Sequence, residues 1–206
     1  MRPLVIGLTG SIGMGKTTVA NMFRSLGIPV HDSDAAVHRL LGKNGRAVAA
    51  VAREFPDAVK EGIVDRRALG NKVFADRRAL TRLESILHPL VREHQRRFLA
   101  GARRRRKPLV VLDIPLLFET GAERRCDLVV VVSAPRFVQS ARVLRRAGMT
   151  AEKFRRILAH QVSDVRKRRL ADFVVPTGLG KAASLRAVKD VVKVARRRLF
   201  RRGRRT

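Results

Sequence analysis

The amino-acid sequence predicts an α/β protein in which helices cover both faces of a parallel sheet. The first observation is a set of short apolar runs at residues 4–9, 109–113 and 128–132, with a further run at 173–175. Continuous Val- and Leu-rich runs of this length are typical of strands that are buried on both faces. The second observation is that helical patterns separate these runs, as the crossover connections of a parallel sheet require.

The N-terminal segment shows this alternation most clearly. Residues 4–9 predict a first strand that ends at Gly10. Apolar residues recur at helical spacing over residues 16–26, and Gly27 is placed to end that helix before a second strand at 28–30. The predicted order is therefore strand, glycine-rich loop, helix and strand.

The length of the chain suits one domain, and its hydrophobic content suits a packed core. The chain has 206 residues, of which 45% are hydrophobic. We expect a single domain over residues 1–200, followed by a basic tail at 201–206. The core of this domain is expected from residues 1–34, 108–135 and 170–200.

Two helical regions interrupt the expected core. Between residues 34 and 107 the sequence shows no convincing strand, and its helical stretches are expected at 46–55, 65–74, 76–87 and 89–106. Asp65 and Asp76 are predicted N-caps. Because one crossover needs fewer residues, we expect the region at about 35–107 to include a substrate-binding lobe. The region at about 136–169 is helical and rich in arginine, which predicts a lid.

The last predicted helix has an apolar face, formed by Leu185, Val188, Val192, Ala195 and Leu199. An arginine-rich segment follows from Arg201 onward. Because terminal segments of this composition have little apolar surface to bury, we expect it to be disordered.

The charge of the chain favours anionic partners. Lys and Arg number 46 against 17 Asp and Glu, which gives a formal net charge of +29. Such a charge suits nucleic acid, an anionic membrane surface or phosphorylated small molecules. The one cysteine, Cys126, excludes an internal disulfide and a multi-cysteine zinc site. The sequence shows neither a signal-peptide pattern nor a membrane-spanning apolar run, so we expect a cytoplasmic protein without membrane attachment.

A phosphate-binding loop is the strongest functional signal. Residues 10–17 read GSIGMGKT, which is the P-loop pattern, between a predicted strand and a predicted helix. Glycines let backbone N–H groups surround phosphate oxygens, Lys16 adds a positive charge, and the Thr17 hydroxyl can bind Mg²⁺. This context predicts a P-loop NTPase-type sheet that binds ATP and Mg²⁺. The predicted nucleotide-binding residues are Gly10, Gly13, Met14, Gly15, Lys16, Thr17 and Thr18.

Carboxylates follow two of the predicted strands, at the sheet edge where ligands of parallel sheets bind. Asp34 is the candidate base that accepts the proton of an attacking hydroxyl. Asp32 suits either such chemistry or a helix cap. Asp113 closes the run at 109–113 and is placed to orient Mg²⁺ or its water.

Arginines in the expected lid offer charge to a transferred phosphoryl group. Most of them suit a solvated helix face. Arg142 and Arg146 lie one helical turn apart, so the pattern places them together. Closing such a lid would screen developing charge and exclude water from the reaction.

These residues together resemble the dephospho-CoA kinase family over nearly the whole chain. The segments that carry the resemblance are residues 6–18, 32–34, 87–89 and 115–119, with Gln161 and residues 171–172. The resemblance implies a P-loop kinase fold with a helical coenzyme-binding region and a lid. It also implies transfer of the ATP γ-phosphate to the ribose 3′-hydroxyl of dephospho-CoA.

The resemblance also implies residue roles. Lys16, Asp34 and Arg142 would be catalytic, with Asp34 as the base and Arg142 as the lid arginine. The substrate would be contacted by Asp34, His88, Leu117 and Arg146. Residues 175–180 depart from the asparagine-containing turn that is common in the family.

Two other functions share parts of this pattern. Another small-molecule kinase, acting on a nucleoside or nucleotide, would have the same P-loop, Asp34 and lid. A nucleic-acid-binding P-loop protein would use the basic run at 103–107 and the arginines between 196 and 205. Nonspecific nucleic-acid binding through the basic tail is also expected from the charge. The oligomeric state does not follow from the sequence.

Overall fold

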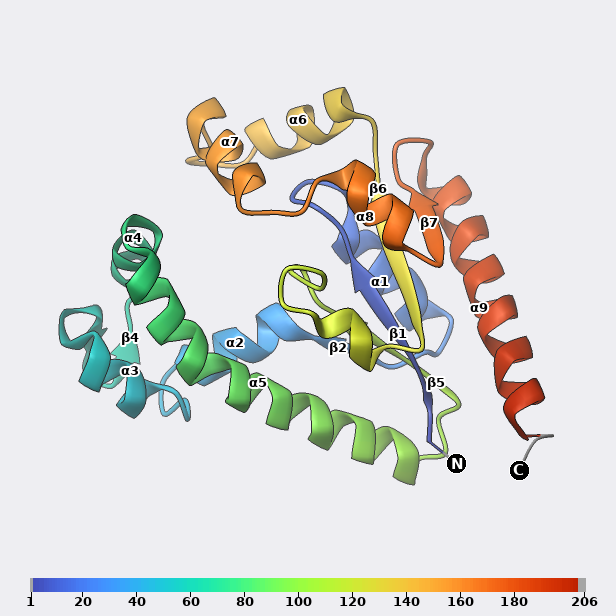
Figure 1. Cartoon of the computed structure of the whole chain (residues 1–206), viewed down its shortest axis with the longest axis horizontal. Coiled ribbons are helices and arrows are strands. Elements are labelled where there is room, and N and C mark those ends of the chain that lie inside the picture. The colour runs from blue at the N-terminus through green and yellow to red at the C-terminus, as the bar shows by residue number, and fades with distance from the viewer. Residues whose placement is uncertain (1, 204–206) are drawn as a thin grey trace. The chain divides into compact units, whose positions relative to one another are not determined.

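The predicted apolar runs form one five-stranded sheet in the computed structural model, which describes residues 2–203 (Figure 1). The strands are β1 (Leu4–Thr9), β2 (Val30–Asp32), β5 (Leu109–Asp113), β6 (Leu128–Ser133) and β7 (Phe173–Pro176). Their order across the sheet is β2-β5-β1-β6-β7, and β1 pairs in parallel with both β5 and β6. The α/β prediction is therefore confirmed, although the second strand begins two residues later than expected.

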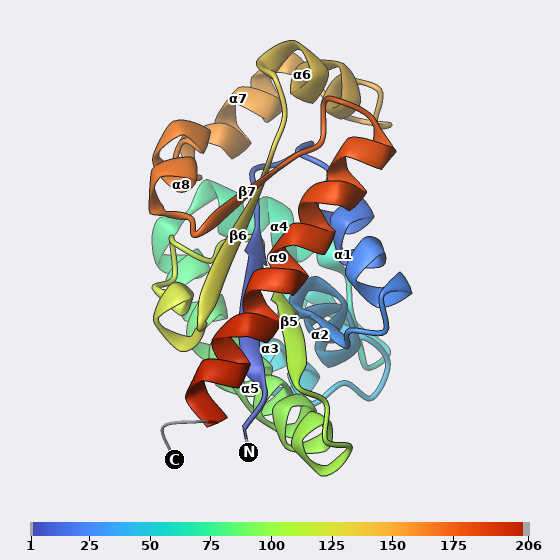
Figure 2. The same ribbon diagram turned by 90° about the vertical axis from the view of Figure 1, so that its right-hand side faces the viewer.

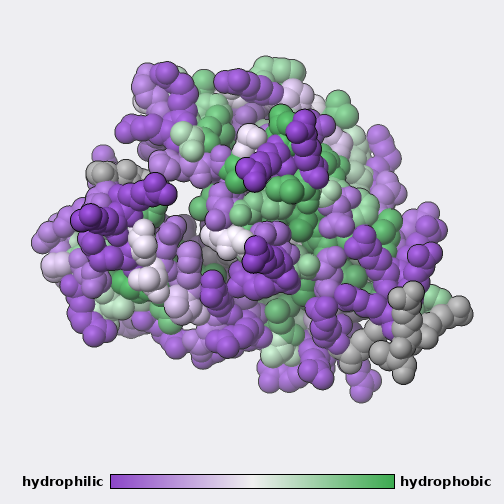
Figure 3. Space-filling model, viewed as in Figure 1, coloured by the Kyte–Doolittle hydropathy of each residue, from purple (hydrophilic) through white to green (hydrophobic). Residues whose placement is uncertain are grey.

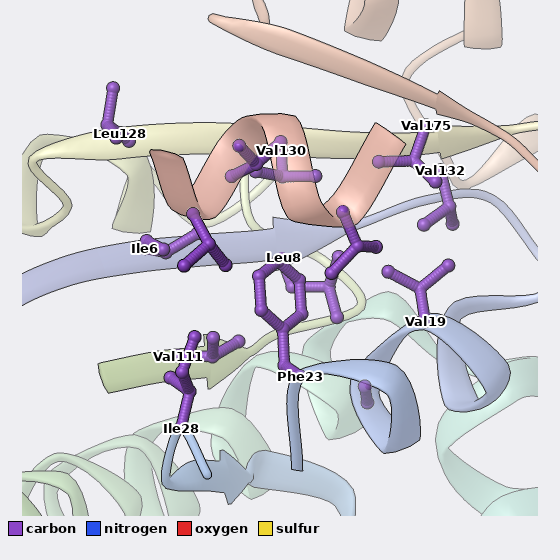
Figure 4. Close-up of a cluster of buried hydrophobic side chains, with 14 of the residues drawn as sticks. Ile6, Leu8, Val19, Phe23, Ile28, Val111, Leu128, Val130, Val132 and Val175 are labelled. Carbon is purple, nitrogen blue, oxygen red and sulfur yellow. The ribbon is translucent and has the colours of Figure 1, made fainter. Parts of the chain in front are cut away.

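Two helices cover one face of this sheet. They are α1 (Lys16–Ser25) and α9 (Lys181–Gly203), which lie side by side across the strands (Figure 2). Phe23 of α1 is fully buried and points toward the strands near Leu8 (Figure 4). The predicted apolar face of the last helix is confirmed, because Val188, Val192 and Ala195 belong to the same buried cluster.

Alternate residues of β1 face the other side of the sheet. There the chain comes close to Gly7, since a Cβ atom at that position would lie 2.6 Å from the Cys126 sulfur. Burial raises the pKa of the Cys126 thiol to about 12, against the opposing effect of the nearby Arg125 charge. Cys126 is thus a packing residue that stays protonated at neutral pH.

The chain between β6 and β7 forms three helices, in agreement with the helical prediction for this region. They are α6 (Arg136–Leu144), α7 (Ala151–Ala159) and α8 (Asp164–Leu170). The structure groups them with the sheet in one compact unit, which includes the described residues up to His31 and those from Gly101 onward. Their role as a lid remains a prediction.

A second compact unit spans Asp32–Ala100 and has its own hydrophobic core. Its elements are α2 (Ser33–Leu41), α3 (Val48–Glu54), the 3-10 turn Pro56–Ala58, β3 (Val59–Lys60), β4 (Ile63–Val64), α4 (Arg66–Ala75) and most of α5 (Arg77–Arg104). Asp65 accepts hydrogen bonds from the N–H groups of Arg67 and Ala68, and Asp76 accepts one from that of Arg78. Both predicted N-caps are confirmed.

Two expectations for this helical unit are wrong. The short strands β3 and β4 pair as an antiparallel hairpin in a region where no strand was expected. The two helices expected on either side of His88 are one helix, α5, with Pro89 inside it. Proline removes one backbone donor from a helix, but Leu83 before it and Leu90 after it pack into the same cluster. That shared packing outweighs the local tendency to end the helix.

The expected disorder after Arg201 is also wrong for the part of the tail that the structure describes. Helix α9 continues through Arg201 and Arg202 to Gly203. One reason is that Arg202 forms an ion pair with Asp127, which fixes the last turn against the sheet. Residues 204–206 of the expected basic tail lie outside the described residues. No helix within residues 2–203 combines the length and the hydropathy that a membrane-spanning segment requires.

Candidate active site

The P-loop connects the end of β1 to the start of α1 and needs glycine at two positions. Gly13 and Gly15 have φ values of 79° and 86°, a conformation that L side chains rarely adopt. A Cβ at Gly13 would also lie 2.4 Å from the Val143 side chain. Within the described chain no side chain caps α1. Its first N–H groups therefore lack helical partners, which is the chemistry of a phosphate-binding helix N-terminus.

A lysine–carboxylate pair lies at the start of α1. Lys16 Nζ is 2.6 Å from Asp113 Oδ1, and their side chains are 16% and 3% exposed. Asp113 reaches this position because it is the last residue of β5, which runs parallel to β1 with Asp113 opposite Leu8. The structure thus brings together two of the predicted residues from segments almost a hundred positions apart. The buried carboxylate also holds the lysine charge at the loop.

The segment after β7 also contacts the P-loop. The Thr177 hydroxyl donates a hydrogen bond to the Met14 carbonyl oxygen at 2.6 Å. Arg142 of α6 donates to the Thr177 carbonyl oxygen at 2.7 Å and to its hydroxyl oxygen at 3.2 Å. The structure therefore links Arg142 to the loop through Thr177. Thr177 was not among the predicted site residues, although it is a hydroxyl residue directly after the carboxyl end of β7.

Two glutamines hold the tip of the loop. The Gln139 side chain donates to the Ile12 carbonyl oxygen at 2.8 Å, and the Ile12 N–H donates to Gln161 Oε1 at 3.1 Å. Both backbone groups of Ile12 are thus fixed by residues from the expected lid region. Gln139 lies on the inner face of α6, four positions before the buried Val143.

The oxygen ligands available near Lys16 fit a magnesium ion that is bound together with a nucleotide. Among residues 2–203, no group of three or more His, Cys, Asp or Glu side chains is placed to bind a metal. Thr17 and Thr18 are exposed in the first turn of α1. The Thr17 hydroxyl and the Asp113 carboxylate are hard oxygen donors, and Mg²⁺ commonly completes its shell with phosphate oxygens and water.

The helical unit contains the candidate base. Asp32 accepts a hydrogen bond from the Ala35 N–H at 2.9 Å and is the N-cap of α2. Of the two roles that the sequence allowed for Asp32, the structure therefore shows the cap. Asp34 lies in the first turn of the same helix with an exposed side chain. His88 lies in α5 and is half-buried.

Two sequence-based expectations, for Leu117 and Arg146, need correction, and the role of Met14 in nucleotide binding stays a prediction. Leu117 is fully buried, so it belongs to the packing under the sheet and presents no surface to a substrate. Arg146 lies beyond the end of α6 at Leu144, so the expected helical pairing with Arg142 is not formed. Met14 is only 3% exposed, and its backbone N–H donates to the Ser11 carbonyl oxygen. That N–H is therefore engaged within the loop in this structure.

The parallel sheet, the P-loop after its first strand, and the lysine paired with a strand-end carboxylate together define a protein of the P-loop kinase class. Comparison with known proteins narrows this class. The family model described as dephospho-CoA kinase matches residues 4–179. The chain therefore belongs to the dephospho-CoA kinase family.

Individual relatives agree with this assignment. A dephospho-CoA kinase of Rhodospirillum rubrum is 56% identical over 207 residues, covering 98% of each chain. A crystal structure from Thermus thermophilus is 38% identical, with a TM-score of 0.83, and covers 94% of this chain and 98% of that one. A dephospho-CoA kinase structure from Campylobacter jejuni is 25% identical, with a TM-score of 0.68 and coverage of 92% and 95%.

Proposed function

We propose that this protein transfers the γ-phosphate of ATP to the ribose 3′-hydroxyl of dephospho-CoA and releases CoA and ADP, which is the last step of CoA biosynthesis. The observation that carries the proposal is the family match over residues 4–179, because it spans both the P-loop and Asp34. A kinase for nucleosides or nucleotides would share the fold, but the family model that matches this chain is that of dephospho-CoA kinase. A cytoplasmic location stays a prediction from the sequence.

On the donor side, the P-loop binds the ATP phosphates through its backbone and the start of α1. The Lys16 ammonium, which the structure pairs with Asp113, moves part of its interaction to the phosphate oxygens when ATP is bound. Thr17 and Asp113 are the residues that would hold Mg²⁺. That ion supplies charge neutralisation and orientation of the phosphates.

On the acceptor side, Asp34 is the proposed general base. It accepts the proton of the 3′-hydroxyl while the ribose oxygen bonds to the γ-phosphorus, and the bond from phosphorus to the β–γ bridging oxygen breaks. The Asp32 cap fixes the first turn of α2, in which Asp34 lies. His88 and Arg146 remain proposed substrate contacts. Arg142 is proposed to screen the charge of the transferred group, from the position at which it now holds Thr177.

The test is a mass-resolved assay with Mg·ATP and dephospho-CoA, run beside a panel of nucleosides and nucleotides. We expect conversion of dephospho-CoA to CoA. Lys16→Ala and Asp34→Asn are expected to reduce turnover by about 100-fold to 10,000-fold, the range for loss of a positioned acid–base or charged group. Asp57→Asn is the matched control, because Asp57 is an exposed aspartate of the same unit that pairs with Lys72 on the surface.

The outcomes separate the parts of the proposal. Phosphorylation of a nucleoside but not of dephospho-CoA would overturn the acceptor. Full activity of Asp34→Asn would overturn its role as base. A fall in Asp57→Asn equal to that in Asp34→Asn would mean that the loss comes from the structure of the helical unit.

A further inference from the structure

Basic segments meet at the edge of the sheet opposite to the P-loop. In a parallel sheet the segments that precede the strands all lie at the amino edge, whereas ligands such as nucleotides bind at the carboxyl edge. Arg2 precedes β1, residues 103–107 read RRRRK before β5, and Arg124 and Arg125 precede β6. Helix α9 returns to this edge with five arginines within residues 196–202. Both ribbon views show the start of β1 and the ends of α5 and α9 at the same end of the sheet (Figures 1 and 2).

Ion pairs connect Arg2 and the end of α9 to the starts of β6 and β7. We call the surface formed by the four basic segments the basic face. Asp127, just before β6, contacts Arg2 at 2.7 Å and Arg202 at 2.9 Å. Asp172, just before β7, contacts Arg198 at 3.4 Å. Burial alone would raise the pKa of Asp127, but the Val5 N–H and the two guanidinium groups lower it overall. Asp127 therefore stays ionised at neutral pH and keeps β1, β6 and α9 together.

The positive charge of the basic face greatly exceeds the acidic charge around it. Thirteen Lys and Arg residues lie in the segments named above, and the neighbouring acidic residues are Glu123, Asp127 and Asp172. In the chain from 2 to 203, no carboxylate lies within ion-pair distance of residues 103–107 or of Arg196. Arg197 and Arg201 are exposed, and no carboxylate among the described residues lies within ion-pair distance of them either. Hydrophilic side chains accordingly surround the C-terminal end of α9 at the lower right of Figure 3.

A hollow on α9 adds an aromatic surface to this charge. It has a volume of about 410 Å³ and is lined by Arg196, Arg197, Phe200 and Arg201. Phe200 is 63% exposed although it is a large apolar residue. An exposed aromatic ring among guanidinium groups is the combination on which a nucleic-acid base stacks while its phosphates are neutralised.

We propose that the basic face binds single-stranded nucleic acid, with the phosphate backbone along its arginines and a base stacked on Phe200. This function goes beyond the kinase reaction and does not depend on it. Arginine, which supplies twelve of the thirteen charges, matches phosphate groups in a bidentate geometry better than lysine does. A membrane surface fits less well. An interfacial helix inserts its apolar face into lipid, whereas Val188, Val191 and Val192 of α9 are buried against the sheet.

The experiment measures binding of a fluorescent 20-nucleotide single-stranded RNA by anisotropy, over a range of salt concentrations, with the full-length protein. The test variant is Arg196→Glu/Arg197→Glu/Arg201→Glu. It is expected to weaken binding at least tenfold and to reduce the slope of log K against log salt by about 2, since each phosphate contact contributes about 0.7 for single strands. Kinase activity should be unchanged. The matched control is Arg67→Glu/Arg77→Glu/Arg78→Glu, which changes the net charge equally on exposed sites of the helical unit.

A second variant, Phe200→Ser, tests stacking separately from charge. It is expected to weaken binding of the single strand by about fivefold or more, with little change in the salt slope and little effect on duplex binding. Equal weakening by the α9 variant and the control would overturn the proposal, because binding would then follow net charge alone. Displacement of the RNA by Mg·ATP would overturn it by placing the RNA at the P-loop. Absence of RNA binding would also overturn it, whether or not the protein binds anionic phospholipid vesicles.

Discussion

A buried lysine of α8, which pairs with a glutamate in the segment after β5, allows the sharpest stability prediction. Lys167 is completely buried, and its Nζ lies 2.9 Å from Glu119 Oε1, whose side chain is 14% exposed. The ammonium is not aligned for a hydrogen bond, so the contact is mainly an attraction of charges. The same carboxylate oxygen accepts a hydrogen bond from the Val162 N–H at 2.8 Å. The pair therefore fixes the chain that leads into α8.

Replacing Lys167 by Met removes the positive charge and keeps most of the side-chain volume. The Glu119 carboxylate is then left largely buried without its counter-charge, and breaking a buried pair in this way costs about 3–5 kcal/mol. With a urea slope of about 3 kcal/mol per molar, the midpoint of unfolding should fall by about 1–2 M. Removing both charges in Lys167→Met/Glu119→Gln should cost much less, because no buried charge is left unpaired. The glutamine oxygen can also keep the bond from Val162.

The assay is urea unfolding of the parent, both single variants and the double variant, analysed as a double-mutant cycle. We expect the double variant to be more stable than Lys167→Met. A loss of less than about 1 kcal/mol in Lys167→Met, or losses of the two single variants that simply add, would show that the two buried charges are not coupled in this way.

Two further predictions concern the Cys126 thiol and Arg142. Because burial raises the pKa of Cys126 from 9.0 to about 12, the folded protein should react with iodoacetamide at pH 8 far more slowly than the urea-unfolded protein. Stability should also fall between pH 9 and pH 12, since the unfolded thiol loses its proton first; rapid alkylation of the folded protein would contradict the burial argument. Arg142→Ala removes both hydrogen bonds to Thr177, so KM for ATP should rise by about tenfold, the effect of losing a charged hydrogen bond. Arg145→Ala is its matched control on an exposed neighbour, and equal effects of the two variants would show that the Thr177 contact is not responsible.

Much of the sheet unit could be predicted from local pattern alone. The runs that became β1, β5 and β6 are continuous Val- and Leu-rich segments, and burial on both faces of a sheet requires that composition. The P-loop could be predicted equally well, because its glycines have to adopt backbone conformations that other residues rarely adopt. Pro89 was misleading, since a local rule on helix breaking took no account of packing on both sides of it.

The candidate site could be predicted only in part, because its residues come from segments that are far apart in the sequence. Lys16 and Asp113 were each identified from their own segments, but their contact depends on the register of β1 and β5. Gln139 and Thr177 were not identified. Their role is to contact the backbone of the P-loop, and that contact has no signature near them in the sequence. Leu117 was predicted to contact the substrate, but its side chain is fully buried.

The order of strands and helices, the phosphate-binding loop and the excess of positive charge could all be predicted from the amino-acid sequence. These features depend on residue types and on short spacings along the chain, and they do not require contacts between distant segments. The packed structure was needed to show that Asp32 is a cap, that Arg142 contacts Thr177 and that α9 remains helical to Gly203. It also gathered four separate basic segments at one edge of the sheet. Such features depend on which distant segments become neighbours, and strand pairing sets that for the chain as a whole.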